Sequence, residues 1–169
     1  MLYKKNKIFA LLAAVVLVCG SCLPISDYPL SEKSYHEEKL LGTWIVKDEE
    51  GKVEETVEIS DSGPRYSWKS TKDDKVMSFI LTKLESYYFM SLCADEEGWV
   101  ILRVQIQDNK FAVLGLNEEG LKLYEKMTET QNDKVKMKVS REELQKWCIS
   151  NAKLFSEELS AYEKQQKTK

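Results

Sequence analysis

The stretch WVILRVQIQ, residues 99–107, carries the clearest structural signal in the chain. Its apolar side chains recur at every second position, at Val100, Leu102, Val104 and Ile106. Successive side chains of a β-strand point to opposite faces, so this alternation predicts a strand with one buried and one exposed face. If Leu102 and Val104 face a core, Arg103 faces away from it.

Similar runs lie on both sides of this stretch. Upstream, strands are expected at 76–84 and 87–93, with Glu85-Ser86 as a tight connection, and 95–98 is a turn. Downstream, residues 108–109 form a turn that leads into another strand at 111–116. Connections this short join neighbouring antiparallel strands, whereas parallel strands need long crossovers.

The strand pattern continues towards both ends of the chain. Three more strands are expected at 43–47, 53–59 and 65–70, and an eighth, edge-like strand at 134–139, where lysines alternate with Val or Met. Residues 61–64, Asp-Ser-Gly-Pro, form a turn. Eight antiparallel strands suit a closed barrel, because closure removes exposed edges and the interior can hold side chains or one small ligand. A two-layer sheet with helices is the competing architecture.

Two short helices are expected beside these strands. Ser34 and Glu37 have capping-box spacing and predict a helix that reaches about Leu41. Asn117 can cap a second helix, inserted after the strand at 111–116 and extending to about Thr128.

A longer helix is expected at the C-terminus. Ser140 and Glu143 form another capping box, and apolar residues then recur at intervals of three and four from Leu144 to Tyr162. This spacing predicts an amphipathic helix of about two dozen residues whose apolar stripe lies on the sheet.

The residues Leu41-Gly42-Thr43-Trp44, at the start of the first strand, resemble the Gly-x-Trp motif of lipocalins and fatty-acid-binding proteins. The layout of residues 34–163 is also similar, and it resembles that of small lipocalin-like domains of bacterial lipoproteins more closely. The resemblance implies a mainly β fold: an eight-stranded antiparallel barrel with a short preceding helix, an inserted helix and a C-terminal amphipathic helix. It also implies that Gly42 lets the chain approach the barrel floor and that Trp44 plugs that end.

The N-terminal residues have a different character. Lysines stand at positions 4, 5 and 7, and residues 8–18 are all apolar. Eleven apolar residues are fewer than the roughly 20 of a transmembrane helix, so the segment predicts a secretory signal. Gly20 and Ser21 precede Cys22, which resembles a lipobox, whereas Cys19 fits less well. We expect lipid attachment at Cys22; a cleaved signal without a lipid is the alternative.

These features give an expected organisation for the whole chain. Residues 1–21 are the signal peptide, 22–33 a tether, 34–163 the lipocalin-like domain and 164–169 a polar tail. Cleavage would remove three lysines and no acid, which leaves 22 basic against 28 acidic residues. The resulting net charge of about −6 opposes nucleic-acid binding. We expect a lipid-anchored protein of the cell envelope that faces the periplasm or the exterior.

Residues with catalytic or metal-binding chemistry are sparse. The chain has one histidine, His36, and neither a P-loop nor a Gly-x-Gly-x-x-Gly motif. We therefore expect no enzymatic activity, no metal site and no cofactor. Cys93 and Cys148 can either form a disulfide or remain two buried thiols.

Aromatic residues on the predicted strands indicate two functions. The leading hypothesis is that the barrel binds a small hydrophobic ligand or an envelope lipid, with Trp44, Trp68, Tyr88, Leu102 and Val104 as its lining. The alternative is an interaction or inhibitor module of the cell envelope with a filled barrel core and a protein partner. A sizeable apolar cavity would favour the ligand, and a filled core would favour the partner.

Overall fold

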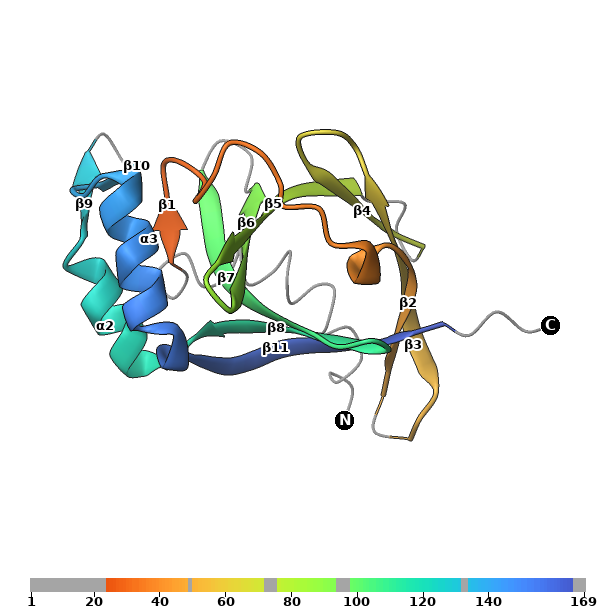
Figure 1. The fold of residues 1–169 in the computed structure, drawn as a ribbon. Coiled ribbons are helices and arrows are strands. Elements are labelled where there is room, and N and C mark those ends of the chain that lie inside the picture. The colour runs from red at the N-terminus through yellow and green to blue at the C-terminus, as the bar shows by residue number, and fades with distance from the viewer. Residues whose placement is uncertain (1–23, 49, 72–75, 94–97, 132–133, 166–169) are drawn as a thin grey trace.

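The computed structural model describes residues 24–48, 50–71, 76–93, 98–131 and 134–165. Its main body has eight strands: β2 (Gly42–Lys47), β3 (Val53–Asp61), β4 (Tyr66–Ser70), β5 (Val76–Leu84), β6 (Tyr87–Cys93), β7 (Trp99–Ile106), β8 (Lys110–Leu116) and β11 (Phe155–Lys164). Each strand pairs antiparallel with the next, and β11 pairs with both β8 and β2 (Figure 1). The eight strands therefore form a closed antiparallel barrel, as predicted, and not a two-layer sheet.

The remaining elements are not among these eight strands, although β1 joins the same sheet by pairing with β7. They are β1 (Ile25–Ser26), the 3-10 helix η1 (Glu38–Leu40), α2 (Glu118–Glu125), β9 (Thr128–Gln131), β10 (Lys134–Met137), α3 (Arg141–Ser150) and the 3-10 helix η3 (Ala152–Leu154). Between β8 and β11 the chain forms α2, a β9–β10 hairpin and α3, which gather at one side of the barrel (Figure 1).

The identity of the eighth barrel strand differs from the prediction. Residues 134–139 were expected to supply it, but β10 pairs only with β9, in a separate two-stranded sheet of the described chain. The eighth strand is β11, in a region predicted to be helical. The predicted C-terminal helix is correct only in its first part, because α3 ends at Ser150.

Two irregularities explain why β11 has helix-like spacing. Its register with β8 shifts between Phe155 and Glu157 and again between Glu158 and Ser160. A bulge inserts an extra residue and interrupts the period of two. The apolar residues of β11 therefore fall three and four positions apart, which is also the spacing of a helix face.

The helix predicted ahead of the first strand is mostly absent. Residues 34–37 are not helical, and only the single turn η1 follows, capped by Glu37. The Ser34 hydroxyl accepts a hydrogen bond from the Leu81 backbone N–H, so it is not free to cap a helix. In contrast, the predicted Asn117 cap and the Ser140–Glu143 capping box are both present.

Two hydrophobic cores organise the molecule. The first fills the barrel with inward side chains from all eight strands. The second lies outside, where the outer face of β6, β7 and β8 meets α2 and α3, and it includes Leu30, Tyr124 and Phe155. The helices thus cover one side of the barrel, as expected for an amphipathic element laid on a sheet.

The segment expected to act as a tether contacts the barrel over most of its length. Pro24 is buried, and Ile25 and Ser26 form β1, which pairs antiparallel with the first residues of β7. Leu30 is fully buried in the second core. The apolar side chains of this segment and the edge of β7 that β8 leaves open account for the contact.

Candidate functional site

The residues predicted to line a ligand site do converge inside the barrel. Trp44, Trp68, Leu102 and Val104 belong to the first core and are 0%, 1%, 1% and 2% exposed. Tyr88 is half-buried and packs against the same core. As the alternation predicted, Arg103 points outward, and its Nη1 donates to the Ala152 carbonyl at 3.0 Å.

Aromatic rings occupy the space these residues enclose. Phe111 stacks on Tyr162 with centroids 4.4 Å apart, and Trp44 meets Phe111 edge-on at 4.7 Å. Trp68 meets Tyr162 edge-on at 5.0 Å and Phe111 at 6.0 Å. Rings at these separations are in direct contact. The middle of the barrel is therefore a packed core.

A group of polar side chains lies within this apolar interior. Ser70 Oγ donates to Glu55 Oε1 at 2.6 Å, and both residues are buried. Burial raises the pKa of the Tyr162 hydroxyl; the nearby Ser160 side chain lowers it and the Glu55 carboxylate raises it further. Trp68 Nε1 and Ser160 Oγ are buried without a hydrogen-bond partner among the described residues. Such atoms are uncommon in folded proteins and often mark a bound water or ligand.

Trp44 lies at the end of the barrel that residues 34–40 cross, which we call the floor. The Trp44 indole N–H donates to the Leu40 carbonyl at 2.8 Å, and Lys164 Nζ lies 5.2 Å from the ring centroid. Gly42 has φ +117, a backbone conformation that side chains rarely adopt. The barrel and its floor are consistent with the lipocalin-like fold that the Gly-x-Trp resemblance implies.

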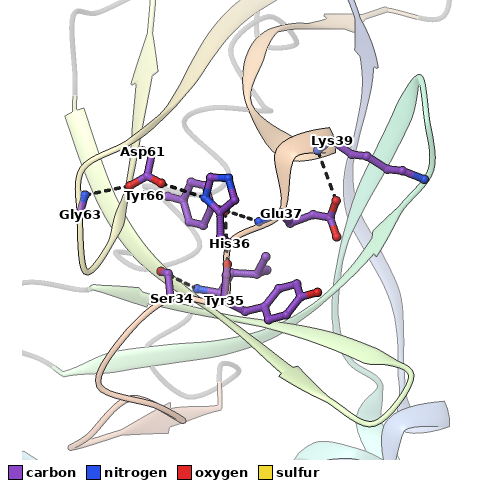
Figure 2. Close-up of polar contacts among 9 residues, drawn as sticks. Ser34, Tyr35, His36, Glu37, Lys39, Asp61, Gly63 and Tyr66 are labelled. Atoms are coloured by element: carbon purple, nitrogen blue, oxygen red, sulfur yellow. Dashed lines mark hydrogen bonds and ion pairs between the residues drawn. The ribbon is translucent and has the colours of Figure 1, made fainter.

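Polar contacts hold the floor segment in place, as Figure 2 shows. Tyr66 Oη accepts from the Glu37 backbone N–H at 2.7 Å and donates to the Tyr35 carbonyl at 3.3 Å. His36 Nδ1 lies 3.0 Å from Asp61 Oδ2 at the solvent-exposed surface. The Tyr88 hydroxyl donates to Glu37 Oε2 at 2.8 Å, which raises the pKa of Tyr88. These groups are engaged in binding the segment to the barrel.

A groove lies on the outer wall over β7, β8 and β11, next to the point where β2 and β11 separate. β2 and β11 pair only at Trp44–Lys164 and Ile45–Glu163. Beyond this point the groove has a volume of about 400 Å³, and its lining includes Ile45, Lys47, Gln105, Lys110, Ala161 and Glu163. Glu163 pairs with Lys47 at 2.5 Å and with Lys110 at 3.3 Å, and both lysines lower the pKa of its carboxyl.

The remaining candidate groups do not form a reactive site. Cys93 and Cys148 are both free thiols, and burial raises the pKa of Cys148 well above its usual range. In the described ranges no three His, Cys, Asp or Glu side chains are placed to hold a metal ion. That the protein is not an enzyme stays a prediction.

Several residues of the interior and the groove were missed from the sequence. Glu55 occupies the same alternate positions of β3 as Val57 and Ile59, and this signal could have identified it as buried. Ser160 and Tyr162 had no such signal, because residues 140–163 have helical spacing. The groove depends on where β2 and β11 separate, which no local pattern encodes.

Cys22, the predicted lipid-attachment residue, lies outside the described residues, as does the predicted signal peptide. No helix in the part of the chain that the structure describes is long and apolar enough to cross a membrane. Comparison of the chain with protein-family models, with curated proteins and with solved structures finds no match.

Proposed function

We propose that the protein is a non-enzymatic module of the cell envelope, anchored to a membrane through a lipid on Cys22, that binds a protein partner through the outer wall of its barrel. The filled interior carries this proposal. Trp68, Phe111 and Tyr162 occupy the space in which a lipocalin-like barrel would hold a ligand. A fatty-acid-sized molecule would have to displace these rings, and each buried aromatic side chain contributes several kcal/mol to stability.

The groove over β11, next to the point where β11 separates from β2, is the surface best suited to the partner. The edge of β11 from Phe155 to Tyr162 has no strand beside it on the β2 side of the described chain. An extended segment of a partner can add to such an edge through main-chain hydrogen bonds, with neighbouring side chains setting specificity. Ala161 is small and exposed there, which leaves room for an approaching backbone.

Binding of a small molecule is the second candidate function. The unpartnered Trp68 Nε1 and Ser160 Oγ favour it, because a bound group with both donors and acceptors would satisfy them. Such a molecule would be small and partly polar, since the rings around Trp68 leave little space.

One experiment separates the two functions. The full-length protein is cross-linked in membranes of cells that produce it, and partners are identified for the wild type, for Ala161→Arg in the groove and for Ser60→Arg on an exposed strand position away from it. We expect a partner that Ala161→Arg loses and Ser60→Arg keeps. Equal capture by all three proteins would contradict binding in the groove. Native mass spectrometry of the same preparations tests the second candidate, which requires a co-purified small molecule.

A further inference from the structure

The chain is built into the barrel wall almost immediately after Cys22. Pro24 is buried, and its carbonyl accepts a hydrogen bond from the Ile101 backbone N–H at 3.0 Å. The Ile25 side chain enters the barrel core, and Ser26 pairs with Trp99 at the start of β7. Only Leu23 therefore separates Cys22 from a residue that is fixed in the fold.

Contacts on the other side hold the same segment. Tyr124 of α2 donates its hydroxyl to the Ile25 carbonyl at 3.2 Å. Asp27 accepts from the Met137 backbone N–H at 3.3 Å, and its carboxylate lies 3.5 Å from Lys136 Nζ in β10. The segment is thus held between β7 on one side and α2 with β10 on the other. It can act as a spacer only if these contacts break.

The next residues are held as firmly. The Leu30 backbone N–H donates to Ser91 Oγ at 3.0 Å, and Gln145 donates to the Leu30 carbonyl at 2.6 Å. The Tyr28 hydroxyl donates to the Val139 carbonyl. Detachment of the whole segment would break these hydrogen bonds and expose Ile25 and Leu30 to water, so it is unfavourable.

We propose that the membrane-anchored protein has no free tether and is held directly against the lipid surface by one side, the β1 flank, which consists of β1, α2 and β10. The proposal rests on lipid attachment at Cys22. Two Cα–Cα steps separate Cys22 from Pro24, about 8 Å in all, whereas a free tether of residues 22–33 would reach about 40 Å. A spacer of 8 Å cannot let the barrel turn its other faces towards the bilayer.

The orientation has a consequence for exposure. β1 pairs with the start of β7, and β3 lies four strands away from β7 in either direction round the barrel, so the start of β3 lies across the barrel from β1 (Figure 1). Lys52, which is exposed at the start of β3, therefore lies away from the lipid surface. Lys126 follows α2 close to Tyr124 and belongs to the near side.

Fluorescence quenching by lipids tests the proposal. The acylated protein, with Cys93→Ser, carries a thiol-reactive fluorophore at Lys126→Cys or at Lys52→Cys, and is reconstituted into phosphatidylcholine vesicles that contain nitroxide-headgroup lipid. We expect quenching at position 126 to exceed quenching at position 52 by about threefold. A Gly-Ser insert of about 20 residues between Leu23 and Pro24, which has an average reach of about 25 Å, should bring the two values together.

Each other outcome overturns the proposal. Equal quenching at the two positions in the protein with native spacing means that the barrel turns freely. A difference that the insert leaves unchanged means that the short spacer does not set the orientation. Mass spectrometry of the N-terminal peptide reports the acyl chains separately, so their absence from Cys22 refutes the anchor itself.

Discussion

Phe155 is the first residue of β11, yet its ring lies outside the barrel, in the second core. It meets Phe89 edge-on at 5.4 Å and lies 6.3 Å from Trp147 of α3, and it is buried. The ring thus joins the barrel wall to the helical side. Phe155→Ala should lower the free energy of unfolding by about 3–5 kcal/mol, the usual cost of deleting a core aromatic ring. Chemical denaturation of residues 24–169 measures this.

The matched control for this change is Glu157→Ala, two residues along the same strand, where the side chain is exposed. It should change the free energy of unfolding by less than about 0.5 kcal/mol. Similar losses for the two variants would contradict the placement of Phe155 in the second core.

Tyr162 and Tyr124 make stability depend on pH in the alkaline range. Burial raises the pKa of both hydroxyls above the ordinary value near 10. Below pH 10 these tyrosines are protonated in both states. Above pH 10, the two tyrosines lose their protons in the unfolded chain but keep them in the folded protein. The free energy of unfolding therefore falls as pH rises. Each residue contributes a slope of about 1.4 kcal/mol per pH unit between its two pKa values.

The test for this slope is urea denaturation of the wild type and Tyr162→Phe at several pH values from about 9 to 11.5. Tyr162→Phe removes one buried hydroxyl and should therefore lose stability less steeply with rising pH. Parallel curves for the two proteins would show that Tyr162 ionises equally in the folded and unfolded states.

At the scale of elements, Gly98 governs how β1 docks. Gly98 has φ +112, and a Cβ added to it would lie 2.5 Å from the Ser26 carbonyl oxygen. Gly98→Ala should cost at least about 2 kcal/mol, because it combines an unfavourable φ with a clash against backbone. Gly51→Ala is the control: its φ is +78, but nothing lies within 4 Å of the added Cβ, so only the conformational cost of about 1 kcal/mol applies. Thermal denaturation compares them, and equal costs would mean that β1 is not held beside Gly98.

Elements with one uninterrupted pattern could be predicted from the sequence, and elements shaped by distant contacts could not. β7 keeps a period of two except at Ile101, which is buried in the second core, and the predicted strand at 99–107 is confirmed. β11 has two bulges, so its local spacing favoured a helix, and only pairing with β8 along its length makes it a strand. Residues 24–31 carry few local signals, because their structure depends on the open edge of β7 and on Tyr124.

At the scale of the whole molecule, inward and outward faces were predictable but their packing was not. Alternation placed Leu102 and Val104 inside and Arg103 outside, and the structure agrees. Whether the barrel is hollow depends on how Trp68, Phe111 and Tyr162 meet across it. These residues come from strands far apart in the sequence, and Tyr162 was assigned to a helix. The filled interior therefore emerges only from the closed barrel.

A filled barrel predicts how the interior responds to apolar molecules. The wild-type protein should show no saturable change in tryptophan fluorescence with a fatty-acid-like probe, because Phe111 packs against Trp44 and Trp68, and Tyr162 packs against Trp68. Phe111→Ala removes the ring that contacts Trp44, Trp68 and Tyr162, and should leave a dry cavity. Benzene should then raise the melting temperature of Phe111→Ala and not that of the wild type, since a ligand that binds only the folded state stabilises it. Phe111→Leu, with a smaller void, is the milder variant if Phe111→Ala does not fold. Saturable binding of the probe by the wild type would show that the interior opens, and would place the small-molecule function ahead of the protein partner.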